Sequence, residues 1–277
     1  MKKMLSNTPP QESGELLKHF SDTYFSLRTV LAGLAFAMPF VLYFYGKLRH
    51  GLDLQPSMSA YFWAAAVEAH CGAFPMRTIF VGFLFATAAA LYAYKGLTPL
   101  ENLLLNAAAL SAAVVAIYPE RLPALAEGDE RLVQLYQMCP AVQDWAAHSR
   151  PPVHYIAAVT LFILLAVVAW ACAKKSLQYL PPPHDRRTFE RLYKSIAIAM
   201  ILFPLPGIGV AYLFGVPEAK VFFIEAAGIW TFGVYWAVKG RELALSRLER
   251  DPPAAMNRAA SDKEATSARP RPQSVPG

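Results

Sequence analysis

The stretch "VHYIAAVTLFILLAVVAWACA" at residues 153–173 is an unbroken apolar run of the length of a membrane span. The hydrocarbon core of a bilayer is about 30 Å thick and takes about 20 apolar residues to cross as a helix. Only a helix or a closed barrel satisfies the hydrogen-bonding groups of the backbone there. The run therefore predicts a transmembrane helix and, where it recurs, an all-α membrane protein.

Five more apolar runs of similar length occur along the 277-residue chain, which is 55% hydrophobic and only 17% charged. A soluble domain carries about 25% charged residues. The six predicted spans are residues 29–46, 78–94, 101–118, 153–173, 195–214 and 221–238. Together they predict an all-α, polytopic transmembrane bundle of six spanning helices.

Basic residues are unevenly divided between the two sides of these spans. With the N-terminus inside, 19 of the 26 Lys and Arg residues lie on inner segments and 7 on outer ones. The positive-inside rule therefore predicts a multi-pass membrane protein with both termini in the cytoplasm. The net charge of +6 is explained by these segments facing anionic lipid headgroups. Nucleic-acid binding is not indicated, because no basic stripe with interleaved aromatic residues occurs.

The segments outside the spans predict three regions. Residues 1–28 form a cytoplasmic tail, in which apolar residues at helical spacing within 14–28 predict an amphipathic helix on the membrane surface. Residues 29–239 form the six-span domain. Residues 240–277 form a second cytoplasmic tail, which is Pro-, Ala- and Ser-rich after residue 251 and is expected to be mostly disordered.

Polar residues gather in the outer stretch "SMSAYFWAAAVEAHCGAFPMRTIFVG" at residues 57–82, whose aromatic and alanine content predicts an interfacial segment at headgroup level. Glu225 lies four residues, or about 6 Å, inside the sixth span. A charge at that depth is costly and usually faces the bundle interior with a partner, so we expect a pair with Arg77 or His154. The candidate polar cluster is Ser57, Ser59, Tyr61, His70, Arg77, His154, Tyr155 and Glu225.

Two interpretations of this cluster remain open. In the first, its residues are headgroup-level anchors, with one pair that stabilises the fold. In the second, they form the wall of an outward-facing polar pocket, with Ser57, Ser59, Tyr61 and His70 on its rim. Only the second interpretation implies a ligand.

Two of the three cysteines, Cys71 and Cys139, fall in predicted outer loops, whereas Cys172 lies in the fourth span. In an oxidising periplasm, Cys71 and Cys139 are candidates for a disulfide that would join the first outer loop to the second. The alternative is two free thiols. No Cys-x-x-Cys or Cys/His metal-binding spacing is present, so these residues give no reason to expect a metal or another cofactor.

The fifth span contains "PLPGIG" at residues 204–209. Its two prolines remove backbone donors and its two glycines permit a bend, so a kinked or broken helix is expected. Some transporters bind their substrate at such a break. A small transporter or channel that uses this break and Glu225 is therefore one alternative function, and a plain kink is the other interpretation.

Several stretches resemble, in this order, an uncharacterised group of bacterial six-helix inner-membrane proteins. They are "SMSAY" (57–61), "MRTIFVGFLFATAAALYAYKG" (76–96), "ENLLLNAAALSAAVVAIYPE" (101–120), "HYIAAVTLF" (154–162) and "FFIEAAGIWTFGVYWAVKG" (222–240). The group typically has Ser-x-Ser-x-Tyr, then Arg-Asp-x-Phe-Val-Gly, then a His at the fourth span and a Glu in the sixth. The resemblance implies the same architecture and brings no established activity. In this chain Thr78 follows Arg77, where the group has Asp.

A weaker likeness, to ceramidase-like membrane hydrolases that use a Ser, an Asp and several His around zinc, implies a different function. Ser59, His70 and His154 would take those roles, and His70, His154 and Glu225 could supply three zinc ligands. Thr78, in place of Asp, departs from that pattern. The sixth span departs from it as well, because it lacks His-x-x-x-His.

The sequence thus favours an integral membrane protein of unknown activity, whose outward polar cluster binds a lipid or another small ligand. A metal-dependent lipid hydrolase and a small transporter or channel are the alternatives. Membrane lipids are the expected partners, and zinc is expected only if the chain is a hydrolase.

Overall fold

The computed structural model describes residues 10–65, 74–122, 130–172, 174–182, 184–202 and 204–267. Within these ranges the regular structure is entirely helical, without strands. Five helices are long and apolar enough to cross a membrane, and a bent pair makes a sixth if it is counted as one span. The predicted all-helical fold with several membrane-length apolar helices is therefore confirmed.

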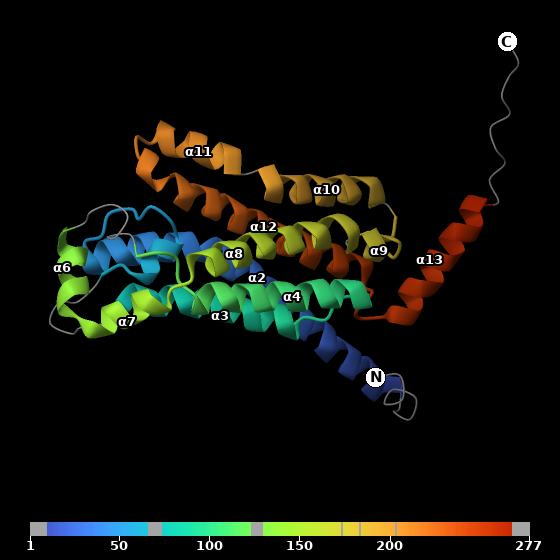
Figure 1. Cartoon of the computed structure of the whole chain (residues 1–277). Coiled ribbons are helices and arrows are strands. Elements are labelled where there is room, and N and C mark those ends of the chain that lie inside the picture. The colour runs from blue at the N-terminus through green and yellow to red at the C-terminus, as the bar shows by residue number, and fades with distance from the viewer. Residues whose placement is uncertain are drawn as a thin grey trace, which may run out of the picture.

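The first predicted span and the predicted surface helix form one element, α2 (Pro10–His50), of 41 residues. At 1.5 Å per residue this helix is about 60 Å long, twice the thickness of a hydrocarbon core. The prediction of a separate amphipathic helix over 14–28 is therefore wrong. Residues 15–32 contain neither Pro nor Gly, so nothing interrupts the helix, and its N-terminal part projects beyond the bundle (Figure 1).

Four more membrane-length helices form the bundle with α2. They are α3 (Pro75–Ala93), α4 (Pro99–Ile117), α8 (Pro151–Val167) with a π-helical continuation (Val168–Cys172), and α12 (Lys220–Ser246), which follows the short turn η3 (Pro217–Ala219). Helix α2 packs on α3 and α12, and α4 packs on α3 and α8. Proline begins α3, α4 and α8, where its fixed φ and missing N–H suit the first helical turn.

The fifth span is broken, as its sequence predicts. Helices α10 (Arg186–Leu202) and α11 (Pro204–Leu213) are bent by 63° relative to each other. Helix α11 lies along α12, and a Cβ atom added at Gly207 would lie 2.8 Å from the Cα of Ile224. Glycine is required at 207 because a side chain there would hold the two backbones apart.

The two ends of the bundle carry different elements, as Figure 1 shows. The cap end carries residues 51–64, with a 3-10 turn η1 (Ser59–Phe62), and the short helices α6 (Glu130–Met138) and α7 (Pro140–His148). The tail end carries the start of α2, the short helix α9 (Lys174–Leu177) and α13 (Pro252–Ser267).

The C-terminal tail is helical over residues 252–267, where disorder was expected, so that prediction is wrong for this part. Asp251 caps α13, since its Oδ1 accepts a hydrogen bond from the N–H of Ala254 at 3.1 Å. The Arg258 side chain donates to the carbonyl of Ser246 at 3.3 Å, and Ala255 is fully buried. A capped, alanine-rich segment whose Arg258 bonds to the end of α12 is expected to form a helix. Residues 268–277 lie outside the described part of the chain.

The segment 57–64 is buried in the core by other residues of the protein, and its predicted position at headgroup level stays a prediction. Met58, Tyr61 and Trp63 each keep 2% or less of their surface exposed. They belong to one buried cluster with Phe80 of α3 and Phe222 of α12. The aromatic residues that suggested a membrane interface fill the space between helices at the cap end.

Candidate functional site

The backbone of residues 56–60 places two serines beside the start of α12. The N–H of Phe222 donates to the carbonyl of Pro56 at 3.0 Å. The N–H of Ala60 donates to Ser57 Oγ at 2.8 Å, which closes a local serine turn. Ser57 and Ser59 are each 4% exposed, so both residues are buried within the protein.

Glu225 of α12 accepts hydrogen bonds from this segment. The N–H of Met58 donates to Glu225 Oε2 at 2.6 Å, and Ser59 Oγ lies 3.3 Å from Glu225 Oε1. The predicted direct pair of Glu225 with Arg77 or His154 is not what the structure shows. A carboxyl group at membrane depth is here satisfied by a backbone amide and a hydroxyl.

His154, in the first turn of α8, reaches the same place through Ser59. Its Nε2 lies 3.1 Å from Ser59 Oγ, and its Nδ1 lies 2.8 Å from the carbonyl oxygen of Tyr118. A carbonyl oxygen only accepts hydrogen bonds, so Nδ1 carries a hydrogen. The ring is 1% exposed. Ser59 thus joins Glu225 and His154 in one hydrogen-bonded chain.

Glu120 extends this polar cluster, although it was not among the predicted site residues. Ser57 Oγ donates to Glu120 Oε1 at 2.8 Å, and Trp63 Nε1 donates to the carbonyl of Glu120 at 3.1 Å. Glu120 is 8% exposed. Glu120 directly follows the third predicted span, on the same outer side as the first outer loop. This position was the sequence signal that could have found it.

Arg77 has a different environment from the one predicted. Its guanidinium lies over four aromatic rings, at 4.4 Å from Phe74, 4.5 Å from Phe62, 4.6 Å from Trp145 and 5.8 Å from Trp63. Such cation–π contacts stabilise a charge without a carboxylate. Arg77 therefore holds η1, α3 and α7 together and is not part of the Glu225 cluster.

The remaining predicted residues are divided between the core, the surface and the undescribed part of the chain. Tyr61 is fully buried, and burial raises the pKa of its phenol to about 12. Tyr155 is 52% exposed and packs edge-on against His154. His70 and Cys71 lie outside the described residues. Cys139 is disulfide-bonded and buried, and its pairing with Cys71 stays a prediction.

An internal cavity of about 70 Å³ lies directly against Ser59 and Glu225, inside the bundle. Among the described residues, Ser59, Thr87 and Glu225 are the polar side chains that line it. Its apolar walls come from five helices and include Met38, Leu84, Ala112, Leu161, Ile229 and Phe232. From Glu225 to Phe232 it extends about 10 Å along α12, by the helical rise. The cavity thus has the Ser59 hydroxyl and the Glu225 carboxyl group at its cap end and a long, mainly apolar body, with Thr87 at its deep end.

A second hollow, of about 460 Å³, lies at the break between α10 and α11, against α12. Its walls are mainly apolar and include Ile196, Pro206, Gly207, Phe223 and Trp230. The transport hypothesis requires a polar cavity that reaches this break. The walls found here do not supply one.

Within the described ranges, no three His, Cys, Asp or Glu side chains are placed to hold a metal ion. Both ring nitrogens of His154 already face oxygen atoms of the protein. The zinc ligand set of His70, His154 and Glu225 includes a residue that lies outside those ranges, so the set itself stays a prediction.

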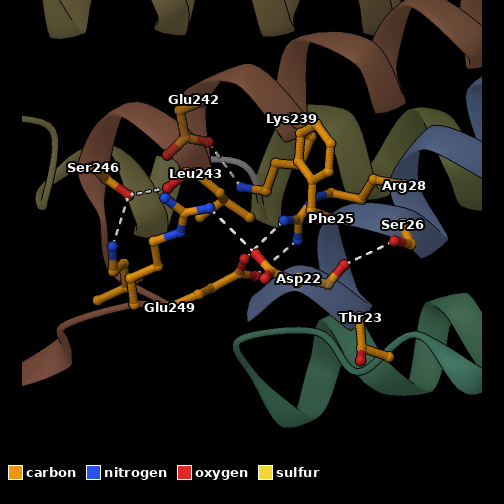
Figure 2. A network of polar contacts seen from close by, with 12 residues as sticks. Asp22, Thr23, Phe25, Ser26, Arg28, Lys239, Glu242, Leu243, Ser246 and Glu249 are labelled. Atoms are coloured by element: carbon orange, nitrogen blue, oxygen red, sulfur yellow. Dashed lines mark hydrogen bonds and ion pairs between the residues drawn. The ribbon is translucent and has the colours of Figure 1, made fainter. Parts of the chain in front are cut away.

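The tail end contains a second polar network, which Figure 2 shows and which the sequence did not predict. Arg28 of α2 makes two hydrogen bonds of 2.7 Å to the carboxylate of Glu249, just after α12. Arg28 is 1% exposed and Glu249 18%. This bidentate pair connects α2 to the segment that directly follows α12.

Next to that pair, Lys239 and Glu242 of α12 are completely buried. Glu242 Oε2 accepts hydrogen bonds from Ser176 Oγ at 2.9 Å, Tyr193 Oη at 2.9 Å and Lys239 Nζ at 3.1 Å. These contacts join α9, α10 and α12. Lys239 and Glu242 lie three residues apart, and therefore on one helix face, which is a sequence signal for an ion pair. Both residues lie where the predicted sixth span meets the predicted cytoplasmic tail.

No protein-family model, curated protein or solved structure matches this chain. The resemblance to bacterial six-helix membrane proteins therefore stays a prediction. The fold and the site define a class, an all-helical protein with five or six membrane-length helices. A polar cluster buried at its cap end lies against an apolar cavity.

Proposed function

We propose that this chain is a multi-pass protein of the inner membrane, with six spans and both termini in the cytoplasm, that binds a single-chain amphiphile in its central cavity. The observation that carries the proposal is the cavity against Ser59 and Glu225, with one polar end and apolar walls from five helices. In the proposed orientation the cap end faces outward, and the amphiphile places its head group at the cluster of Ser59, Glu225 and His154.

The physical argument is that the two ends of the cavity favour the two parts of such a ligand. Each methylene group moved from water into apolar surroundings contributes about 0.8 kcal/mol. A water molecule needs about 15 Å³ of such volume, so 70 Å³ accommodates about five groups of that size in a row. The Ser59 hydroxyl and the Glu225 carboxyl group can exchange hydrogen bonds with a polar head.

The distribution of Lys and Arg supports the orientation, since 19 of 26 fall on the side of the two termini. That side includes the long tail-end extensions of α2 and α12 and the basic start of α10. The α10–α11 pair would act as the fifth span. Membrane lipids are then both the surroundings of the protein and the natural source of its ligand.

Binding of a tritium-labelled short-chain monoacylglycerol, whose acyl chain of about four carbons matches the 70 Å³ cavity, to the purified protein, measured by scintillation proximity, tests the proposal. Ala112 lies on the cavity wall and is fully buried. Ala112→Leu should displace about two methylene groups of the ligand, at about 0.8 kcal/mol each, and so weaken binding about tenfold. The matched control is Ala113→Leu, on the same helix but not on the cavity wall, which should bind as the wild type does. Equal binding by all three proteins would refute the proposal.

A lipid hydrolase is the second candidate, and one contact favours it. Ser59 Oγ lies 3.1 Å from His154 Nε2, and His154 Nδ1 is held by a carbonyl, as in a nucleophile with its base. Release of fatty acid from monoacylglycerol or an amide-linked lipid, abolished by Ser59→Ala, would establish this function. Intact substrate after prolonged incubation, with and without added zinc, would leave ligand binding as the function.

A further inference from the structure

The hydrogen bonds around Ser59 require one proton more than a Glu225 carboxylate, a serine hydroxyl and a neutral His154 carry together. This extra proton determines the head group that the site accepts. The inference rests on the proposed binding function. A serine hydroxyl has one hydrogen, and Ser59 Oγ faces two acceptors, Glu225 Oε1 at 3.3 Å and His154 Nε2 at 3.1 Å. Because His154 Nδ1 already donates to Tyr118, neutral His154 has no hydrogen left on Nε2.

One of the two contacts of Ser59 therefore needs a hydrogen from the other side. Either Glu225 is a carboxylic acid that donates to Ser59, which donates to His154, or His154 is an imidazolium that donates to Ser59, which donates to Glu225. Both arrangements contain the same number of protons and have zero net charge. They interconvert by shifting hydrogens along the chain Glu225–Ser59–His154, which we call the proton chain.

Within the described residues, no neighbouring cation pairs with Glu225 and so takes the place of this proton. Glu225 makes no ion pair within the described part of the chain, where its hydrogen-bond partners are Met58 and Ser59. The other titratable groups nearby are Glu120, after α4, and Tyr155, on α8, and neither brings a positive charge. Across the cavity from the proton chain, helices α2, α3 and α4 present apolar side chains, at Met38, Phe80 and Val115.

We propose that the cavity takes an amphiphile with an uncharged, hydrogen-bonding head group, such as a hydroxyl, an ester or an amide, and that it does so only while the proton chain holds its proton. A phosphate or ammonium head would leave water for a proton chain whose net charge is zero and whose groups are already paired with one another, which is costly without a counter-charge. An ammonium head could bind only by displacing the proton from the chain. An uncharged head exchanges hydrogen bonds with Ser59 and Glu225 at no such cost.

Three probes with hydrocarbon chains of the same short length separate the head groups: a short-chain monoacylglycerol, the corresponding lysophosphatidate and an alkylamine. The expected result is that the monoacylglycerol competes best against the labelled ligand. A lysophosphatidate or amine that competes better would overturn this inference and leave the proposed binding function standing. Absence of binding by all three would refute both.

The pH dependence tests the proton itself. Above the pH at which the chain loses its proton, the dissociation constant of the monoacylglycerol should rise about tenfold per pH unit, because binding requires the proton. Glu225→Gln replaces the acid by an amide that always donates to Ser59, so it should bring the affinity at high pH up to the low-pH value. Glu218→Gln, at an exposed position of η3 outside the polar cluster, is the matched control and should keep the wild-type pH dependence. A wild-type affinity that does not change with pH would contradict the proton count.

Discussion

Removing one partner of the Arg28–Glu249 pair tests whether the tail end of the bundle is held by a buried charge pair. Glu249→Met leaves the guanidinium of Arg28 without its two hydrogen bonds of 2.7 Å, at a position that is 1% exposed. Breaking a buried pair in this way costs about 3–5 kcal/mol of unfolding free energy. Because Glu249 is 18% exposed and water reaches it, we take the low end, about 3 kcal/mol. That loss lowers the folding equilibrium constant about a hundredfold.

The double variant separates the stranded charge from the value of the pair. Replacing both residues, as Arg28→Met with Glu249→Met, removes the charge as well as its partner. Buried pairs replaced by apolar residues are often nearly neutral, so the double variant should be at least about 1 kcal/mol more stable than Glu249→Met alone. The exposed pair Asp22–Arg250, at 3.2 Å and with both side chains more than half exposed, is the control. Asp22→Asn should cost less than about 1 kcal/mol.

The assay is unfolding in mixed micelles with increasing sodium dodecyl sulfate, followed by tryptophan fluorescence and extrapolated linearly. The reasoning would be refuted if Glu249→Met cost no more than Asp22→Asn. It would also be refuted if the double variant were less stable than Glu249→Met and Arg28→Met alone. An unpaired buried charge would not then explain the loss of stability in Glu249→Met.

Three further predictions follow from single contacts. Gly207→Ala should lower the free energy of unfolding by about 1–3 kcal/mol, because its methyl group would meet the backbone of α12 at 2.8 Å. Gly209→Ala, with open space around it, should be neutral or slightly stabilising, and equal effects of the two variants in the same assay would contradict this prediction. Lys239→Met should lower the free energy of unfolding by about 3 kcal/mol or more, because it leaves the fully buried carboxylate of Glu242 without its cation. A change below about 1 kcal/mol would show that Lys239 and Glu242 do not form an ion pair. Thiol labelling of the denatured, non-reduced protein should leave Cys71 and Cys139 unmodified, and modification of both would show that they are not bridged.

The sequence predicted the membrane-length helices well because apolar length is a local signal. The run 153–173 is read directly from neighbouring residues, whereas α3 and α4 begin at Pro75 and Pro99, a few residues before the predicted spans 78–94 and 101–118. The separate surface helix over 14–28 and the disordered tail were wrong for a related reason. Nothing local in 15–32 ends a helix, and the hydrogen bond from Arg258 to the carbonyl of Ser246 joins residues 12 apart, which no local pattern contains.

The candidate site was predicted in part. Depth in the membrane was enough to single out Glu225, and the hydroxyl-rich segment gave Ser57 and Ser59, but not which atoms would meet. The partner of Glu225 is a backbone N–H, which every residue has and which therefore leaves no sequence signal. Arg77 was misassigned because its four aromatic partners come from three separate segments. Charge pairing was the expected solution, and aromatic rings took its place.

Photo-crosslinking tests the central claim, that the cavity holds a single-chain amphiphile with its head at the proton chain, most directly. The probe is a short-chain monoacylglycerol with a diazirine at the end of its acyl chain, and the labelled residues are identified by peptide mapping. The account predicts labelling at the deep end of the cavity, at Thr87, Leu165 and Phe232, and loss of that labelling in Ala112→Leu. Labelling confined to outward-facing residues such as Ile156 and Leu213, which are 67% and 82% exposed, would contradict it.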